Sequence, residues 1–358
     1  MQAFLNTINH GYFLGMVTLL LVVAASSSLG WIVCRYALRI KWRYGLGGSL
    51  VELVLGIDLL ALLMLFLGAM EMAKAPVLWT LLSVLALPLL IFKLPELTKM
   101  IAAFIWKNPL FAAIFFIATL YTLSSALCYP YAWDELTYQI SVPLRWLRTG
   151  NIQVFTDNPY SGFPLMPNLL FMAGLETGGI LFPRLLVWTM YSILIVGFYI
   201  VLRPEANKWA ALICVVAFFL SPVLLAMMRE TYVEPFILVN LVAALLIFQT
   251  ADNEFLWKKA LVCGVFAGAA ASVKLTGAGA AVLIAIFLLS RIRGKITISI
   301  REVVLPAGLT ALVYALAFYL RPWLFTGNPV YPFMAELFSG SKPAIEVTKF
   351  HYAMGSAH

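Results

Sequence analysis

Charged residues are scarce in this sequence. Only 11% of its 358 residues are charged, whereas 63% are hydrophobic. About a quarter of the residues in a typical soluble domain are charged. The composition therefore excludes an ordinary soluble protein and indicates a chain that crosses a membrane many times.

Histidine and paired cysteine are also lacking. The three histidines all lie near the termini, so no interior histidine can contribute to a histidine-rich metal centre. The four cysteines lie in or beside apolar runs, without a CxxC pair. This pattern favours small buried apolar side chains over a disulfide framework or a zinc site.

Apolar runs of about 20 residues, the length that crosses a bilayer, dominate what is present. We find runs near 12–34, 50–70, 77–92, 109–128, 184–202, 209–228, 236–250, 260–273, 277–290 and 303–320. The two runs on either side of Lys274 are short, which predicts broken or tilted helices there. The predicted fold class is an all-α polytopic membrane protein with about ten transmembrane helices.

The distribution of Lys and Arg predicts the orientation of the chain in the membrane. If the basic loops 35–49 and 291–302 face the cytoplasm, alternation places 15 Lys/Arg and 5 Asp/Glu on that side and 9 of each on the other. The net charge of +8 then reflects topology. We therefore expect no nucleic-acid partner.

The long polar segment 129–183 must then lie on the outer side as one piece. Its parts 136–149 and 164–182 predict two amphipathic helices at the outer membrane surface, the first bent or broken at Pro143. Loops between spans are usually short, so a long loop rich in acids, bases and aromatics at the bilayer edge predicts an active site.

The adjacent carboxylates Asp134 and Glu135 are the candidate catalytic residues. They follow Trp133 at the outer end of a span, where acids beside an aromatic belt also occur without any catalytic role. A partly desolvated carboxylate at this place can act as a general base. Adjacent side chains point in different directions, so we expect one catalytic and one structural residue, and favour Asp134 for catalysis.

Cations on the same side are candidates for phosphate binding. Lys274, between two apolar runs, either reaches the interface by snorkelling or binds a phosphate. Arg321 and Arg229 each either bind phosphate or pair with an acid.

Further side chains on that side are candidates for substrate binding: Tyr138, Arg145, Tyr232 and Glu234. Glu234 precedes Pro235, so it either favours the start of a helix or helps to orient an acceptor and hold a divalent cation. The sequence specifies no certain cofactor, and whether a metal binds is unknown.

Two further features lie inside the predicted spans. Gly264 and Gly268 form a GxxxG spacing, which is typical of close helix packing. Asp58 lies within the second apolar run and either packs against a polar group of a neighbouring span or relays protons.

The spaced segments WDELTYQISVPLRWLRTGNI, YSGFPLMPNLLF, TYVEP, KLTG and TGNPVYPF resemble bacterial membrane glycosyltransferases of the GT-C class. They are similar to the aminoarabinose transferase and protein O-mannosyltransferase families, over about 109–335. The resemblance implies transfer of a sugar, usually with inversion, from a polyprenyl-phosphate donor to an extracytoplasmic acceptor glycan, lipid or protein.

The resemblance assigns a role to three residues. It implies that Asp134 is the base, that Lys274 faces the donor phosphate and that Glu234 lies near donor or acceptor. The chain departs from the family pattern at Gln139, where the family often has His, and at Glu234, where it often has Asp. It also stops soon after TGNPVYPF, so a partner subunit is a possible source of the part that relatives carry beyond this point.

The resulting domain prediction has three parts. Residues 1–108 form N-terminal transmembrane helices, 109–335 a GT-C-like core with an outer catalytic loop at 129–183, and 336–358 an extracytoplasmic C-terminal segment. We expect a multi-pass protein of the bacterial inner membrane, in contact with membrane lipids. A membrane transporter or lipid flippase without bond cleavage is the alternative, and a non-catalytic anchoring subunit is a third possibility.

Overall fold

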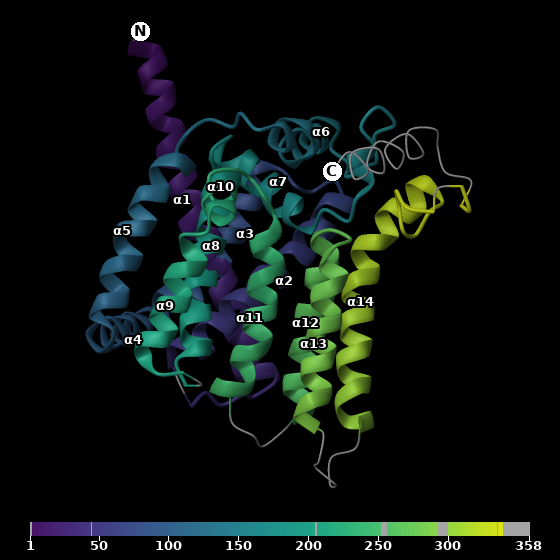
Figure 1. The fold of residues 1–358 in the computed structure, drawn as a ribbon. Coiled ribbons are helices and arrows are strands. Elements are labelled where there is room, and N and C mark those ends of the chain that lie inside the picture. The colour runs from purple at the N-terminus through teal and green to yellow at the C-terminus, as the bar shows by residue number, and fades with distance from the viewer. Residues whose placement is uncertain are drawn as a thin grey trace.

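A computed structural model describes residues 2–43, 45–204, 206–251, 256–292, 300–334 and 336–338. Within these ranges every regular element is helical (Figure 1). The α-helices are α1 (Gln2–Ile32), α2 (Gly45–Ala69), α3 (Ala75–Pro88), α4 (Leu94–Lys107), α5 (Pro109–Ala126), α6 (Ser141–Thr149), α7 (Met166–Gly178), α8 (Phe182–Leu202), α9 (Lys208–Phe219), α10 (Pro222–Met227), α11 (Glu234–Thr250), α12 (Leu256–Val273), α13 (Gly277–Ile292) and α14 (Ile300–Thr326). Short π-helical and 3-10 turns are η1 (Val33–Ala37), η2 (Leu89–Lys93), η3 (Glu135–Gln139) and η4 (Pro159–Gly162).

The predicted apolar runs coincide with helices. Seven described segments are long and apolar enough to cross a membrane: Gly11–Ala37, Gly45–Ala69, Ala75–Lys107, Pro109–Ala126, Phe182–Leu202, Leu256–Val273 and Arg301–Thr326. The shorter apolar helices Glu234–Thr250 and Gly277–Arg291 correspond to two of the remaining predicted runs. The third, 209–228, is divided in the structure into Lys208–Phe219 and the short α10, with a break before Pro222. The structure thus supports an all-α, multi-pass membrane protein. The number of spans stays a prediction.

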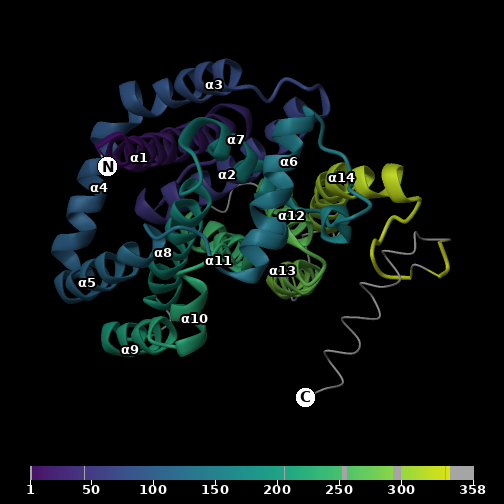
Figure 2. The same cartoon turned by 90° about the horizontal axis from the view of Figure 1, so that it is seen from above.

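The long polar segment lies at one end of the helix bundle, which we call the loop end (Figure 1). Seen from that end, α6 lies near the middle of the view, between α2 and α11 on one side and α12 and α13 on the other (Figure 2). Its Val142 and Trp146 are buried, whereas Arg148 is exposed. Only 141–149 of the range predicted as an amphipathic helix, 136–149, is α-helical. The interruption falls at Ile140, between η3 and α6, and Pro143, where a bend or break was predicted, lies within the first turn of α6.

The second predicted surface helix is helical but is not at the surface. In α7 almost every side chain is buried, and the helix packs against α1, α2, α6 and α8. Its apolar residues therefore contact protein on all sides, and α7 forms part of the core. A sequence that is apolar all round is typical of such a buried helix.

The GxxxG spacing in α12 marks a close helix contact, as predicted. A Cβ atom at Gly264 would lie 2.3 Å from the Ala307 carbonyl oxygen, and one at Gly268 would lie 2.6 Å from that of Ala311. Both oxygens belong to the backbone of α14, which cannot move aside cheaply. These two glycines therefore set the separation of α12 and α14.

Gly264→Ala is therefore expected to destabilise the protein by about 1–3 kcal/mol, because the added methyl group forces the helices apart. Gly308→Ala in α14 is the matched control, since a Cβ atom there meets nothing within 4 Å. Helix propensity alone favours the control substitution. Thermal unfolding of the two variants in detergent measures the difference, and equal unfolding midpoints would contradict the assignment.

The carboxylates inside α2 have partners. Asp58 lies against Asn240 of α11, whose Nδ2 is 3.4 Å from Asp58 Oδ1, as expected for packing against a neighbouring polar group. Glu52 pairs with the buried Lys93 and accepts a 2.7 Å hydrogen bond from Trp42 Nε1. Both acids are buried among helices.

Candidate functional site

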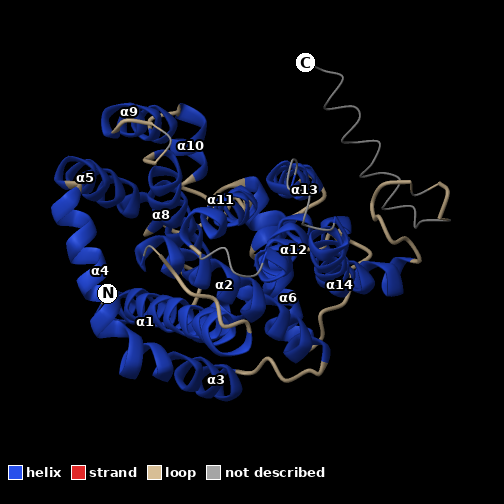
Figure 3. Ribbon diagram, turned by 90° about the horizontal axis from the view of Figure 1, so that it is seen from below, coloured by secondary structure: helices blue, strands red, loops and turns tan. Residues whose placement is uncertain are grey.

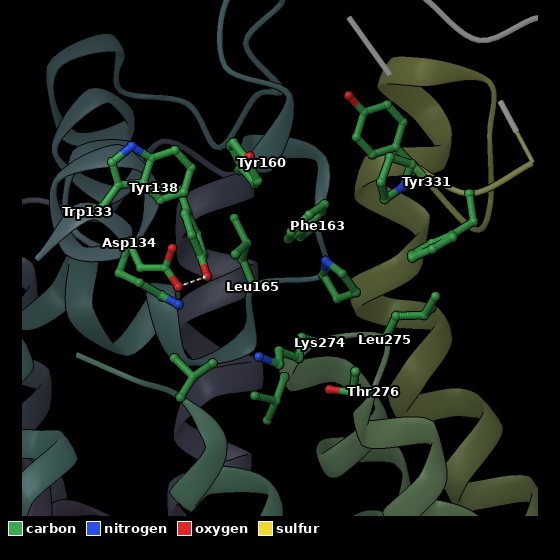
Figure 4. A pocket seen from close by; sticks show the side chains of 16 residues that line it. Trp133, Asp134, Tyr138, Tyr160, Phe163, Leu165, Lys274, Leu275, Thr276 and Tyr331 are labelled. Atoms are coloured by element: carbon green, nitrogen blue, oxygen red, sulfur yellow. Dashed lines mark hydrogen bonds between the residues drawn. The ribbon is translucent and has the colours of Figure 1, made fainter. Parts of the chain in front are cut away.

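A cavity of about 410 Å³ opens at the loop end (Figure 4). Segments that are distant in the sequence line it: 133–134, 138–139, 160, 163–165, 233, 273–276 and 331–333. The fold thus brings the predicted acid-bearing loop, the start of α11, the α12–α13 junction and the segment after α14 around one space.

Asp134 lines one wall of this cavity. The carboxylate is half-buried, and Tyr138 Oη donates a 3.1 Å hydrogen bond to its Oδ2 (Figure 4). Burial raises the pKa of Tyr138, and the charge of Asp134 adds to the effect. Tyr138 therefore stays protonated as a donor and fixes the orientation of the carboxylate.

Aromatic rings form much of the same wall. Tyr138 stacks on Tyr160 with ring centroids 5.2 Å apart. Trp133 and Phe163 meet Tyr160 edge-on, with centroid distances of 5.7 and 5.5 Å. Such a wall offers apolar faces to a ligand beside a single carboxylate.

Lys274 also lines the cavity, and Figure 4 shows its amine extending into the same space as Asp134. It occupies the break between α12, which ends at Val273, and α13, which begins at Gly277. The Gly277 N–H donates a 2.8 Å hydrogen bond to the Lys274 carbonyl, which closes the turn. The predicted break at Lys274 is therefore present, and it exposes the ammonium group at a helix end.

Lys274 forms an ion pair with Glu234 at the first turn of α11. The two side chains are 33% and 25% exposed, so an entering ligand can reach the ammonium group. Glu234 Oε2 is buried without a hydrogen-bond partner among the described residues. Glu234 itself does not line the cavity, and the contact that the structure shows for its carboxylate is the ion pair with Lys274.

Glu135 points away from the cavity into a buried network. Arg184 donates to it from Nε at 2.8 Å and from Nη2 at 2.6 Å. The backbone N–H groups of Tyr131, Ala132 and Thr231 also donate to it, at 3.0, 3.0 and 2.9 Å. Burial would raise the pKa of Glu135, but the hydrogen bonds from Arg184 and the backbone outweigh it and hold the pKa below its ordinary value. Glu135 is thus held as a structural anion that joins the loop to α8.

Arg321 does not line the cavity, and its guanidinium group is hydrogen-bonded to backbone carbonyls of the polar loop. It is 6% exposed and donates to the Ser161 carbonyl oxygen at 2.9 Å and to that of Phe163. Its guanidinium group also lies over the Trp146 ring, 5.0 Å from the centroid. The structure therefore shows Arg321 attaching the polar loop to α14, where a phosphate contact was predicted.

Three other predicted residues also lie outside the cavity lining. Arg145 forms a two-point pair with Asp157, at 2.8 and 2.9 Å. Arg229 donates to Tyr121 Oη at 3.1 Å. Burial raises the pKa of Tyr232, with a further contribution from the Asp134 carboxylate, so this side chain lies within the electrostatic reach of the site.

Arg184 and, apart from Tyr138, the residues of the aromatic wall were not predicted as site residues from the sequence. Arg184 stands alone at the start of an apolar run, and a lone buried arginine requires an anion elsewhere in the fold. Tyr160, Phe163 and Tyr331 lie within the polar segments YSGF and NPVYPF. Their density of aromatic residues was the available signal.

In the part of the chain that the structure describes, no cluster of three or more His, Cys, Asp or Glu side chains could hold a metal ion. The predicted segment 336–358 lies outside the described residues apart from 336–338.

The chain was compared with protein-family models, with curated proteins and with solved structures. None of these comparisons gives a match.

Proposed function

We propose that this protein is a glycosyltransferase. It moves a sugar from a polyprenyl-phosphate donor to an extracytoplasmic acceptor glycan, lipid or protein at the loop end, with inversion at the anomeric carbon. The observation that carries the proposal is that Asp134 and Lys274, which are distant in the sequence, line one cavity. The sequence resemblance to the GT-C class supports it independently.

The cavity suits a substrate with a lipid tail and a phosphate. Apolar helices surround it, so a prenyl chain can stay in the bilayer while the phosphate reaches Lys274 at the interface. The donor phosphodiester carries one negative charge and has two non-bridging oxygens that can accept charge-assisted hydrogen bonds from the Lys274 ammonium group beside Glu234. Lys274 then stabilises the leaving phosphate as the glycosidic bond breaks.

Asp134 is placed to activate the acceptor. The proton of an acceptor hydroxyl or amine passes to the carboxylate while the acceptor atom bonds to the anomeric carbon. The bond from that carbon to the phosphate oxygen breaks, and its electrons leave with the polyprenyl phosphate. If the acceptor binds at the carboxylate and the phosphate at the ammonium group, attack and departure take place on opposite faces of the sugar, which gives inversion.

The aromatic wall and the loop explain how the reaction excludes water. Arg321 and the Glu135–Arg184 pair attach the polar segment to α14 and α8 over the bundle end. Tyr160 and Phe163 on that segment cover the cavity with apolar surface. Limiting the entry of water protects an activated donor from hydrolysis.

A direct test adds labelled polyprenyl-phosphate sugars to the purified protein together with extracts that supply acceptors. Release of polyprenyl phosphate and appearance of labelled acceptor support the proposal. The alternative is a transporter or lipid flippase. The specific observation in its favour is the buried Asp58, whose Oδ2 has no hydrogen-bond partner among the described residues. Movement of substrate across proteoliposomes with the donor bond intact would establish that alternative.

Lys274→Gln is expected to weaken donor binding by about tenfold to a hundredfold, because a charged hydrogen bond to phosphate is worth roughly 1.5–3 kcal/mol. Titration with unlabelled polyprenyl phosphate measures this change without requiring turnover. Lys208→Gln on α9, exposed and absent from the cavity lining, removes the same charge and serves as the control. Unchanged binding in Lys274→Gln would remove Lys274 from the donor site.

A further inference from the structure

A second and larger cavity, of about 640 Å³, lies between the helix ends away from the loop end. We call it the basal cavity, and its lining comes from residues 43, 45–47, 100, 103–104, 107, 200, 203–204 and 249–250. The start of α2 and the ends of α4, α8 and α11 therefore surround it. No predicted site residue lies in its lining, so the proposed function does not use it.

The lining of the basal cavity has one sign of charge. Arg43, Lys107 and Arg203 contribute to it, and no Asp or Glu does so among the residues that the structure describes. Lys107 and Arg203 are exposed at the ends of α4 and α8. This arrangement favours an anionic ligand.

Apolar side chains form most of the rest of the lining. Met100, Ala103 and Phe104 of α4 and Ile200 of α8 contribute, together with the polar Gln249 and Thr250. No residue of α4 is fully buried, and the helix runs along the margin of the bundle in the view of Figure 3. A lipid at this margin can therefore reach the cavity.

The depth of the cavity selects the class of ligand. It lies where apolar helices begin or end, and these ends mark the level of the phospholipid headgroups. Cations at that level with apolar side chains in the same lining match a phosphate with acyl chains. A soluble phosphate would use the cations and leave the apolar wall unexplained.

We propose that the basal cavity binds one anionic phospholipid, with its phosphate at Lys107 and Arg203 and its acyl chains along Met100, Phe104 and Ile200. This would attach α4 to the rest of the bundle through a lipid. The site stands apart from the proposed transfer reaction, so either proposal can fail without the other.

The test titrates purified protein with dioctanoyl phosphatidylglycerol and follows binding by native mass spectrometry. Dioctanoyl phosphatidylcholine and inorganic phosphate are separate arms of the same experiment. We expect phosphatidylglycerol to bind much more tightly than either. The Lys107→Gln/Arg203→Gln variant should bind it roughly 30-fold more weakly, which corresponds to about 1 kcal/mol per cation.

The control is Lys99→Gln/Lys208→Gln. It removes two exposed lysines outside the basal-cavity lining, the first of them on α4, with the same change in net charge. Phosphatidylglycerol should bind this variant as it binds the unmodified protein, and Lys107→Arg/Arg203→Lys should retain most binding. Three results would overturn the proposal. They are equal affinity for the two lipids, equally tight binding of inorganic phosphate, and an equal loss of phosphatidylglycerol binding in Lys107→Gln/Arg203→Gln and in Lys99→Gln/Lys208→Gln.

Equal affinity for the two lipids would have a clear physical meaning. The negative ends of α4, α8 and α11 also face this region, and Lys107 and Arg203 can complement them without any ligand. In that case the cations serve only the helix ends, and lipid headgroup charge has no effect on binding.

Discussion

Asp134→Asn is expected to abolish sugar transfer while the protein remains folded. The amide keeps the size of the carboxylate and can still accept the hydrogen bond from Tyr138, but it cannot take a proton from an acceptor. A general base contributes about 10²–10⁴ in rate, so turnover should fall by at least this range. Release of labelled polyprenyl phosphate measures the loss.

Glu176→Gln is the matched control for this variant. Glu176 is an exposed acid near the loop end that accepts a 3.1 Å hydrogen bond from the Ala75 N–H, and it does not line the cavity. Its replacement removes the same charge and should leave turnover unchanged. Donor binding should persist in Asp134→Asn, because Lys274 is intact. Turnover close to that of the unmodified protein in Asp134→Asn would exclude Asp134 as the base.

Glu135→Gln should lower the free energy of unfolding more than Arg145→Gln does. The substitution leaves the buried Arg184 guanidinium group without its anion, and breaking a buried pair in this way costs about 3–5 kcal/mol. Arg145→Gln breaks the exposed pair with Asp157, and exposed pairs contribute about 1 kcal/mol or less. Thermal unfolding in detergent should therefore separate the two variants clearly.

The double variant Glu135→Gln/Arg184→Met distinguishes an ion-pair effect from general disruption. Methionine removes the uncompensated guanidinium charge, while glutamine still offers an acceptor to the backbone N–H groups that donate to position 135, so stability should recover relative to Glu135→Gln. The pH dependence has a defined sign. Because the pKa of Glu135 is lowered in the fold, its contribution is present above its ordinary pKa and is lost as the pH falls through the lower folded value. Similar unfolding of Glu135→Gln and Arg145→Gln would contradict the assigned roles.

These two predictions assign different tasks to neighbouring carboxylates. Asp134 faces the cavity, whereas Glu135 begins the turn η3 and faces Arg184 of α8. Sequence alone predicted that one would be catalytic and the other structural, and it favoured Asp134 for catalysis. The structure adds the partner that holds Glu135, 49 positions along the chain.

Composition and spacing along the chain were sufficient to predict most of the helices and the interruption between α12 and α13 at Lys274. Continuous apolar runs require helices in a membrane because each backbone polar group must find a partner within its own segment. The interruption at Lys274 was also local, since a lysine and a following Gly277 stand between two short apolar runs. These features depend on nearby residues, so spacing and composition were enough to predict them.

Packing between distant parts of the chain, by contrast, sets which charged groups face the cavity and which are buried in ion pairs or hydrogen bonds. Arg321 attaches to carbonyl groups 160 and 158 positions away, and α7 is surrounded by helices that precede and follow it in the chain. A local pattern gives the position of a charge along the chain but not its partner. The partner is set by how helices from distant parts of the chain pack together.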